Sequence, residues 1–248
     1  MLTTRHLDIG YGRRTVLTDL NLRLEPGALT VLIGANGCGK STLLRTLGGS
    51  QPALRGDVLL DGSPIAALDA AERARRMAIV LTDRTGGGGL RVDELVAVGR
   101  HRFSGFFGRL HPDDRRAVAE ALELVGLSHK AVAMVASLSD GERQKAMIAR
   151  AVAQDAPLIL MDEPTAFLDV SARFEVMELL GRLCRQRDRT VLLSTHDIAP
   201  SLAVADCVWA VADGTVSAGP PAALASAGVL DRVYAGVRFD ASSGDYRR

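Results

Sequence analysis

The chain has 248 residues, of which 47% are hydrophobic and 24% charged, a balance typical of one large or two small globular domains. Its 30 basic and 29 acidic residues give a formal net charge of +1, which excludes a whole-chain attraction to nucleic acid or anionic lipid. Cys38, Cys184 and Cys207 form no C-x-x-C pair, which argues against a disulfide scaffold or zinc module and favours a reducing compartment. We expect a soluble chain, because its first residues do not resemble a signal peptide and no apolar run approaches the ~18 residues of a membrane span.

The first third of the chain has the pattern of short strands separated by turns. Leucines alternate with polar residues before the turn at Pro26-Gly27, and a short apolar run follows it. A glycine-rich segment then leads into a helical stretch. The predicted strands span 20–24, 28–33, 56–60 and 77–81, and the predicted helix spans 40–47.

The pattern changes after residue 82. Glycines 86–89 break the chain, and the apolar spacing beyond them predicts a helical insertion over 83–155. From Pro157 strands and helices alternate again, which favours an α/β fold with a mainly parallel sheet covered on both faces. The polar tail from Ala241 is expected to be frayed. The later predicted elements are helices over 92–98, 113–125, 141–154 and 197–205, a helix with Val176, Leu179, Leu180 and Leu183 on one face, and strands over 158–161, 191–193 and 207–211.

A glycine-rich motif follows the predicted strand 28–33 and begins the predicted helix. The match to G-x-x-x-x-G-K-[ST] is Gly34-Ala35-Asn36-Gly37-Cys38-Gly39-Lys40-Ser41. Its glycines let successive backbone N–H groups surround a phosphate, and the helix N-terminus adds a favourable dipole. Lys40 would reach the terminal phosphates, and the Ser41 hydroxyl would ligate Mg²⁺. The motif therefore predicts a P-loop NTPase core.

Polar residues end two of the later apolar strands. Asp162 and Glu163 follow 158–161, at the strand end where ligands of open α/β sheets collect. Asp162 would hold Mg²⁺ through water, and Glu163 would polarise the attacking water. His196 would lie on the same rim and contact the γ-phosphate. Such an acid pair alone is more often a helix cap, and a lone histidine is more often structural, but the upstream P-loop favours the catalytic interpretation.

The segment Leu138-Ser139-Asp140-Gly141-Glu142 leads into the predicted helix 141–154. One interpretation is a capping box, with Ser139 as N-cap and Glu142 three residues later. The other is a phosphate site, because a helix start exposes backbone N–H groups. Since the segment lies in the helical insertion, away from the P-loop in sequence, we expect it to serve a second molecule's nucleotide.

These motifs, together with the segment 165–169, resemble the ATP-binding cassette (ABC) transporter subunit family in its motif order over roughly residues 2–235. The resemblance implies one ABC ATPase domain over 2–237, with a core of 2–82 and 156–237, the insertion 83–155 and a short tail over 238–248. N-terminal antiparallel strands would accompany the mainly parallel sheet. The family also implies a head-to-tail dimer of two copies that holds two ATP molecules, each between one copy's P-loop and the other's signature segment, residues 138–142.

The resemblance also assigns the cofactors, ATP and Mg²⁺, and the roles of the motif residues. Glu163 would be the catalytic base, His196 the γ-phosphate contact and Asp169 part of the loop linking the two sites. Tyr11 would stack on adenine, the alternative being a surface tyrosine at a strand end. The other implied ATP contacts are Gly34, Ala35, Asn36, Gly37, Cys38, Gly39, Lys40, Ser41 and Thr42 in one copy and Ser139, Gly141 and Glu142 in the other, with Ser41 and Asp162 at the metal.

The sequence departs from the family pattern at three places. Thr82 stands where the family has a glutamine near Mg²⁺, and we expect Thr82 or Asp83 to make the metal or water contact instead. Asp140 and Glu142 replace the commoner glycine and glutamine, which puts two acids near a phosphate. Cys38 lies within the P-loop, so we expect alkylation of its thiol to block ATP binding and ATP to protect it.

Several segments resemble cassettes of importers for iron–siderophore, haem or cobalamin: 80–84, 99–110 and the signature helix. The implied partners are a polytopic permease and, indirectly, a substrate-binding protein, with no nucleic acid. The implied location is the cytoplasmic face of the cell membrane. A groove beside 83–110 would receive a permease helix. Phe103, Phe106 and Phe107 would mark that contact, and the alternative is that they simply pack the insertion.

Two other functions compete with the transport motor. One is a soluble cassette that remodels nucleic acid or assembles metal clusters, but such proteins tend to carry paired cassettes, long insertions or basic arms. The other is a nucleotide-dependent scaffold with little turnover, suggested by the missing glutamine. Lys40, Asp162, Glu163 and His196 are all present and count against the scaffold.

Overall fold

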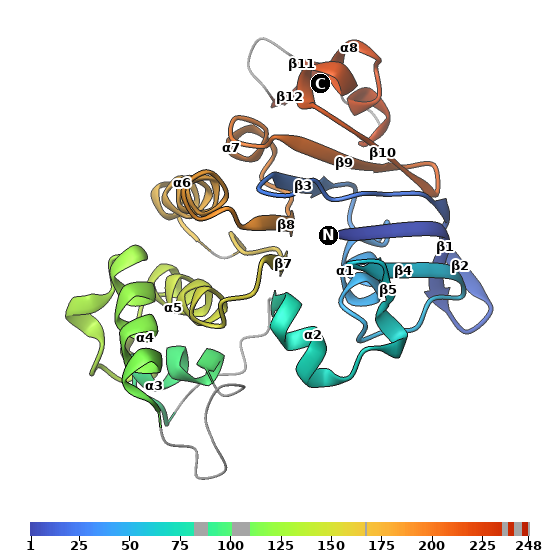
Figure 1. Ribbon diagram of the computed structural model, residues 1–248. Coiled ribbons are helices and arrows are strands. Elements are labelled where there is room, and N and C mark those ends of the chain that lie inside the picture. The colour runs from blue at the N-terminus through green and yellow to red at the C-terminus, as the bar shows by residue number, and fades with distance from the viewer. Residues whose placement is uncertain (82–88, 101–109, 167, 235–237, 241–244, 248) are drawn as a thin grey trace.

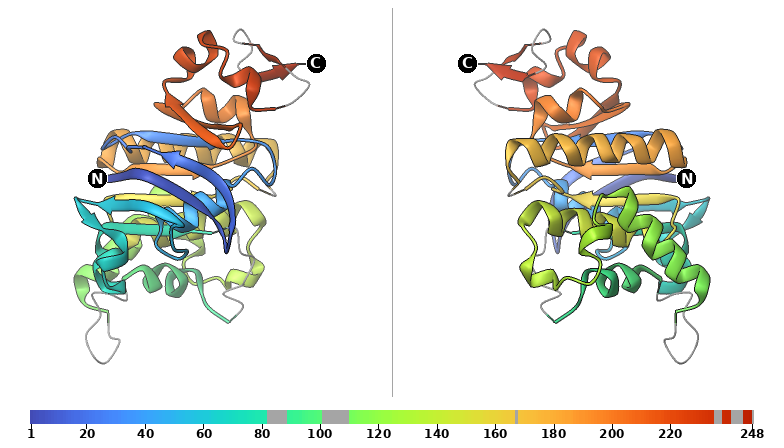
Figure 2. Two further views of the ribbon diagram at one scale, coloured as in Figure 1. Left: turned by 90° about the vertical axis from the view of Figure 1, so that its right-hand side faces the viewer. Right: turned by 90° about the vertical axis from the view of Figure 1, so that its left-hand side faces the viewer.

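Two large β-sheets, a two-stranded C-terminal sheet and a separate group of helices form the described part of the protein in the computed structural model (Figure 1). The structure describes residues 1–81, 89–100, 110–166, 168–234, 238–240 and 245–247. Figure 2 shows the sheets stacked in the body of the molecule, with α3 and α4 along one side and the C-terminal elements at the opposite end.

The larger sheet confirms the prediction of a mainly parallel sheet. In sheet order its strands are β10 (Thr215–Gly219), β9 (Cys207–Ala212), β3 (Leu29–Ile33), β8 (Thr190–Ser194), β7 (Leu158–Asp162) and β6 (Met77–Val80). The strands from β9 to β6 run parallel, and β10 pairs with β9 as an antiparallel edge. Every residue of β3 and β7 is buried, as expected for parallel strands that are covered on both faces.

The smaller sheet is antiparallel and lies across α1 from the larger one. Its strands are β2 (Arg14–Leu20), β1 (Leu2–Tyr11), β4 (Arg55–Leu60) and β5 (Ser63–Pro64). The helix α1 (Lys40–Leu47) contacts β1 of this sheet and β7 and β8 of the parallel sheet. The resemblance-based expectation of N-terminal antiparallel strands is thus met, although β2 ends at Leu20 and the next leucines only border β1.

Successive residues of the parallel strands point into two different cores, because side chains alternate across a strand. Leu32, Leu160 and Leu192 pack with α1 and the antiparallel sheet. Their neighbours, such as Ile159 and Leu193, pack against the helices on the other face. The parallel sheet therefore joins the two cores and supports the loops at its carboxyl end from both sides.

The remaining helices flank the sheets or form the helical group. The flanking elements are η1 (Ile65–Ala67), α2 (Ala70–Arg76), α6 (Val170–Arg187), α7 (Ile198–Leu202), α8 (Pro221–Ser226) and η5 (Leu230–Arg232). The helical group holds α3 (Val92–Ala97), η2 (Val98–Arg100), α4 (Pro112–Leu124), η3 (Ser128–Lys130), η4 (Val135–Ser137) and α5 (Asp140–Ala153). None of the helices in the described ranges is long and apolar enough to cross a membrane.

The C-terminal residues correct one expectation. Instead of a frayed tail, β12 (Asp245–Arg247) pairs antiparallel with β11 (Arg238–Asp240). The Tyr246 ring packs edge-on against Tyr234, with centroids 4.9 Å apart, and its hydroxyl donates a 2.7 Å hydrogen bond to the Leu230 carbonyl. The composition of the tail obscured this because a few aromatic contacts anchor otherwise small and polar residues.

A buried ion pair fixes the helical group. Arg100 Nε lies 2.9 Å from Asp114 Oδ1, and Arg100 also donates a 3.0 Å hydrogen bond to the Ala153 carbonyl at the end of α5. Asp114 is 2% exposed and receives the His111 N–H on its other oxygen. Arg100 therefore links η2, α4 and α5 and compensates a buried carboxylate.

We expect Arg100→Met to lower the free energy of unfolding by about 3–5 kcal/mol, because it leaves the Asp114 charge buried without its cation. Urea denaturation followed by circular dichroism measures the loss. The control is Arg116→Met, which removes an exposed pair with Asp113 on α4 and should cost at most about 1 kcal/mol. Equal losses in the two variants would contradict the special role of the buried pair.

Candidate nucleotide-binding and catalytic site

The P-loop joins β3 to α1, and its backbone conformation depends on glycine. Gly37 and Gly39 have φ values of 76° and 111°, which place both in the left-handed region. A Cβ atom at Gly39 would also lie 2.6 Å from the Val16 side chain. The Lys40 ammonium folds back over the loop and donates hydrogen bonds to the carbonyls of Gly34 at 2.8 Å and Ala35 at 3.2 Å. Backbone N–H groups, a helix start and one cation thus surround a phosphate-sized space.

Asp162 at the end of β7 connects the P-loop to the neighbouring strand. Its Oδ1 atom accepts hydrogen bonds from Ser41 Oγ at 3.2 Å and from Ser194 Oγ at 2.6 Å. The sheet register produces this contact, because Asp162 and Ser194 are paired across β7 and β8. The Asp162 carboxylate is 9% exposed, and with the Ser41 hydroxyl it offers the oxygen ligands that Mg²⁺ prefers. These residues fit the predicted metal site.

Glu163 and His196 meet at the same sheet edge. Glu163 Oε2 lies 2.8 Å from His196 Nδ1, and the Glu163 N–H donates to the Ser194 carbonyl and hydroxyl at 3.1 and 3.0 Å. Glu163 has a φ of 47°, rare for a non-glycine residue, which turns its side chain out of the strand line. The structure therefore brings the predicted base and the predicted γ-phosphate contact together.

A cleft of about 370 Å³ lies over the P-loop. It is lined by Tyr11, Arg14, Val16, Asn36, Gly37, Gly39, Lys40, Ser41, Thr42 and Glu163. Tyr11 is 53% exposed, and its hydroxyl lies 3.1 Å from Thr42 Oγ1. The cleft thus gathers most of the predicted ATP contacts of one copy; Gly34, Ala35 and Cys38 are not among its lining residues.

Cys38 is half-buried beneath the P-loop and packs against the core around α1. A Cβ atom at Gly34 would lie 2.6 Å from its sulfur, so the thiol fills the space under the loop. Burial raises the pKa of the Cys38 thiol above its usual 9.0, and the nearby Lys40 charge opposes the shift. Burial also raises the thiol pKa of Cys207, and that of Cys184 to about 12. The three thiols therefore react slowly at neutral pH.

The signature segment forms the N-terminus of α5 and does not line the P-loop cleft of its own copy. Ser139 is the N-cap, and its hydroxyl accepts the Glu142 N–H at 3.3 Å. Glu142 Oε2 in turn accepts the Ser139 N–H at 3.0 Å and its hydroxyl at 3.1 Å. The capping box expected as one interpretation is present, and Gly141 leaves the helix start open beside it.

Asp169 caps the N-terminus of α6. Its carboxylate accepts a 2.8 Å hydrogen bond from the Ala172 N–H, and the side chain is exposed. The start of α6 also lies close to the start of α5. A Cβ atom built at Gly141 of α5 would lie 3.4 Å from the Cβ atom of Ala172 in α6. Asp169 thus lies on the segment that leads from the catalytic edge into α6, whose start adjoins α5.

Sequence reasoning missed a buried carboxylate directly after His196. Asp197 is 8% exposed and accepts 2.6 Å hydrogen bonds from the Thr165 hydroxyl and from the Arg173 guanidinium. Its own N–H donates to Thr195 Oγ1 at 2.9 Å. The network ties the His196 loop to the segment after Glu163 and to α6. A polar residue after an apolar strand was the available signal, but its partners come from distant positions.

Two groups of predicted residues lie outside the described ranges: Thr82 and Asp83, and Phe103, Phe106 and Phe107. The described part of β6 ends at Val80, which pairs with Met161 in β7. Val80 therefore lies at the same sheet edge as Asp162.

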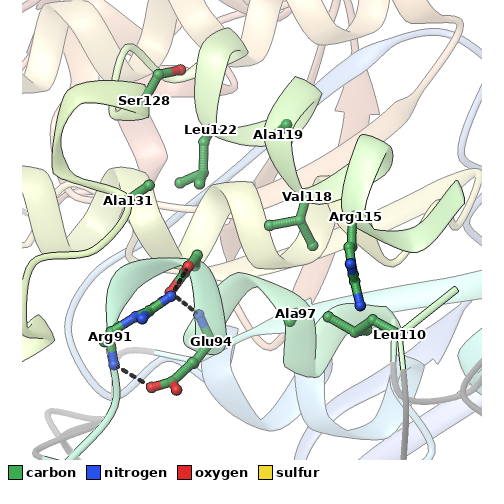
Figure 3. A pocket seen from close by; sticks show the side chains of 11 residues that line it. Arg91, Glu94, Ala97, Leu110, Arg115, Val118, Ala119, Leu122, Ser128 and Ala131 are labelled. Carbon is green, nitrogen blue, oxygen red and sulfur yellow. Dashed lines mark hydrogen bonds and ion pairs between the residues drawn. The ribbon is translucent and has the colours of Figure 1, made fainter. Parts of the chain in front are cut away.

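A larger hollow of about 470 Å³ lies on the helical group, between α3, α4 and η3 (Figure 3). Val118 and Leu122 of α4 point into it, and Arg91, Glu94 and Arg115 stand at its margin (Figure 3). We call it the α3–α4 groove; its lining residues are Arg91, Asp93, Glu94, Ala97, Leu110, Arg115, Val118, Ala119, Leu122, Ser128 and Ala131. It lacks the glycine cradle and paired oxygen ligands of the P-loop cleft, so it suits an apolar surface of a partner better than a nucleotide.

Comparison with known proteins identifies the family of the chain. Residues 17–166 match the family model described as ABC transporter. The chain belongs to this family. It is 40% identical over 215 residues to the iron(3+)-hydroxamate import ATP-binding protein FhuC of Bacillus subtilis, covering 87% of this chain and 80% of that protein. It is 38% identical to the ferric enterobactin transport ATP-binding protein FepC of Escherichia coli, over 94% of this chain and 86% of that protein.

A solved structure shares the fold and extends the comparison to a nucleotide-bound state. The dimeric cassette MJ0796, bound to ADP and Pi in a post-hydrolysis state, has a TM-score of 0.77 and 26% identity, covering 89% of this chain and 98% of that one. The predicted fold and ATPase activity are thus confirmed: the ABC cassette is an ATP-binding, ATP-hydrolysing P-loop domain.

The geometry suits ATP hydrolysis. The P-loop N–H groups and Lys40 would bind and orient the phosphates, which is the largest requirement of phosphoryl transfer. Mg²⁺ held near Ser41 and Asp162 would neutralise charge on the phosphate oxygens. The Glu163 carboxylate would accept a proton from water, and its 2.8 Å contact with His196 Nδ1 would orient it.

We expect Glu163→Gln to lower the ATPase rate about 10²–10⁴-fold, because the amide cannot accept the proton. ATP binding should persist, since the P-loop is untouched. Phosphate release and equilibrium binding of a fluorescent ATP analogue measure the two effects. Glu178→Gln, at an exposed position of α6, is the control with unchanged rate. Turnover in Glu163→Gln above a tenth of the unmodified rate would assign the base elsewhere.

We expect maleimide alkylation of Cys38 to abolish ATP binding, because the added group displaces the P-loop from its packing. Because burial raises the thiol pKa, the reaction should accelerate as the pH rises from 7 to 9. ATP should slow it by holding the loop closed. Mass spectrometry and nucleotide titration follow the reaction, with Cys38→Ala as the insensitive control. Unchanged affinity after complete modification of Cys38 would contradict the expectation.

Proposed function

We propose that this chain is the ATPase subunit of an importer of ferric siderophores. The names of its relatives from Bacillus subtilis and Escherichia coli support this cargo class, since both are subunits for iron chelates. The segments that resemble siderophore, haem and cobalamin cassettes support the same subfamily. Haem and cobalamin are the other chelates that this subfamily would carry.

The observation that carries the ATPase role is the meeting of four groups at one sheet edge. Ser41 and Asp162 are within 3.2 Å, and Glu163 and His196 are within 2.8 Å. They come from α1, β7 and the end of β8, so only the folded sheet assembles them. We assign Mg²⁺ to Ser41 and Asp162, with Thr82 or Asp83 as the additional metal or water contact.

The proposed working unit is a head-to-tail dimer of this chain. Ser139, Gly141 and Glu142 lie at the α5 N-terminus, outside the P-loop cleft of their own copy. A second copy would bring this helix start to the nucleotide, with Asp169 in the loop between the two sites and Tyr11 against adenine. The dimeric state of MJ0796 supports this arrangement.

A polytopic permease is the proposed membrane partner, and the α3–α4 groove is its proposed docking site. Val118 and Leu122 form the apolar floor of the groove. Val132 and Met134 follow η3 in the chain and add exposed apolar side chains beside the groove. A short permease helix would fill this space. The chain would then act at the cytoplasmic face of the membrane, would meet a substrate-binding protein only through the permease, and would not bind nucleic acid.

Two competing functions predict different behaviour of the chain. A soluble cassette would act without a membrane partner, and a scaffold would bind ATP with little turnover. The balanced charge of the chain speaks against a nucleic-acid role. The Glu163–His196 contact speaks against a scaffold, since a base oriented for hydrolysis would serve no purpose there.

We expect the tagged chain to capture a polytopic membrane protein from detergent-solubilised native membranes. Ala119→Arg puts a long charged side chain on the exposed wall of the α3–α4 groove and should abolish this capture. Its basal ATPase rate should stay within about twofold, because surface substitutions away from the site have small effects. Mass spectrometry identifies the captured protein.

The matched control is Glu120→Arg, one residue further along α4, which faces a separate polar hollow and should retain capture. Reconstitution of the captured permease in vesicles then measures ATP-dependent uptake of a ferric hydroxamate, haem and cobalamin. Capture of a soluble protein alone would move the chain to the soluble cassettes. Uptake of haem or cobalamin without the hydroxamate would correct the cargo.

A further inference from the structure

Two acids lie at the helix start that the proposed dimer brings to a triphosphate. Asp140 and Glu142 are both in the first turn of α5. A helix N-terminus favours negative charge, so these carboxylates compete with a phosphate for the same N–H groups. Any productive contact with a second copy's nucleotide therefore requires that the charge of these acids be compensated.

Glu142 is the more deeply engaged of the two acids. Its Oε2 atom accepts both the N–H and the hydroxyl of Ser139, at 3.0 and 3.1 Å. The carboxylate thus contacts the hydroxyl that the proposed dimer presents to the phosphate. Asp140, by contrast, has a side chain 60% exposed, is solvated, and faces Arg143 at 3.7 Å.

The second carboxylate oxygen of Glu142 faces a lysine from another element. Lys130 Nζ of η3 lies 2.5 Å from Glu142 Oε1, and the side chains are 34% and 26% exposed. Backbone hydrogen bonds on both sides hold this lysine in place, from the Lys130 N–H to the Leu127 carbonyl and from the Ala133 N–H to the Lys130 carbonyl. The fold of the helical group therefore fixes the backbone from which the Lys130 side chain reaches Glu142.

The Lys130 contact and the Ser139 N–H lower the pKa of the Glu142 carboxyl to about 2. Glu142 is consequently charged throughout the physiological pH range, and protonation cannot relieve its repulsion of a phosphate. The chain has only three lysines, of which Lys40 lies in the P-loop and Lys145 pairs with Glu175 on α6. Lys130 is the lysine that the fold places against the Glu142 carboxylate.

We propose that Lys130 is a positioning residue of the nucleotide site: it neutralises Glu142, so that Ser139 and the α5 N-terminus accept the triphosphate bound to a second copy. This role rests on the proposed head-to-tail dimer. It explains how the chain can use Glu142 where its family commonly has a neutral glutamine, since the positive charge of Lys130 offsets the negative charge of Glu142. Lys130 and Glu142 then act as a pair.

The test measures ATP-driven dimerisation of the full chain in the Glu163→Gln background, which retains ATP. Sedimentation velocity at several protein concentrations gives the dimer dissociation constant with MgATP. We expect Lys130→Ala to raise this constant about tenfold or more, because one uncompensated charge then faces the phosphates. The increase should shrink in 0.5 M salt, at which exposed charges are screened within about 5 Å.

Rescue distinguishes charge compensation from a structural role of the lysine. In Lys130→Ala combined with Glu142→Gln, the repelling charge is absent, so dimerisation should return to within about threefold of Glu142→Gln alone. Lys145→Ala is the matched control, because it removes another ion pair of α5, with Glu175, and should leave the dimer constant unchanged. The thermal midpoint of each nucleotide-free variant reports any loss of stability.

Two outcomes would overturn the role of Lys130 alone: dimerisation of Lys130→Ala at the parental constant, or a double variant as weak as Lys130→Ala. A Glu163→Gln parent that binds ATP and stays monomeric would overturn the dimer and, with it, the role of Lys130. The parental measurement therefore separates the failure of the proposed assembly from the failure of this inference.

Discussion

The Asp162 carboxylate is the contact on which the catalytic edge depends. A buried carboxylate needs hydrogen-bond donors, and two serines donate to the same Asp162 oxygen. Ser41 belongs to α1 and Ser194 ends β8, so one side chain joins the P-loop to two strands. Ser194 also accepts the Glu163 N–H, which sets the backbone of the catalytic base. Phosphate cradle, metal ligands and base are therefore positioned by one connected set of bonds.

A second network extends this arrangement toward the helical group. Asp197 joins the loop after β8 to Thr165 and Arg173, and Asp169 caps the helix that carries Arg173. The start of that helix, α6, adjoins Gly141 at the start of α5. The loop that carries His196 is thus tied to α6 by polar contacts, and the start of α6 lies against the start of α5 at Ala172.

The secondary structure followed closely from local pattern. The helix at the P-loop spans 40–47 as predicted. The parallel strands differ from their predicted bounds by no more than one residue at either end. These elements were readable because the buried strands are short apolar runs and because glycines mark their ends. The helix predicted over 197–205 is shorter, α7 being Ile198–Leu202, and the C-terminal hairpin was missed. The strand predicted over 20–24 is not found, and no range was predicted for β1 or β10. The C-terminal hairpin depends on contacts with distant residues rather than on local spacing.

The sequence by itself determined the chemistry: a glycine loop with Lys40 and Ser41, two acids at one strand end and a histidine at another. It could do so because these motifs need residues close together in the chain. Only the tertiary structure decided which partners complete them. The pairing of β7 with β8 brings Ser194 to Asp162, the folding of η3 onto α5 brings Lys130 to Glu142, and Asp197 finds Thr165 and Arg173 across two loops. Such contacts join positions far apart in the chain, and strand register and helix packing set them, which no local pattern encodes.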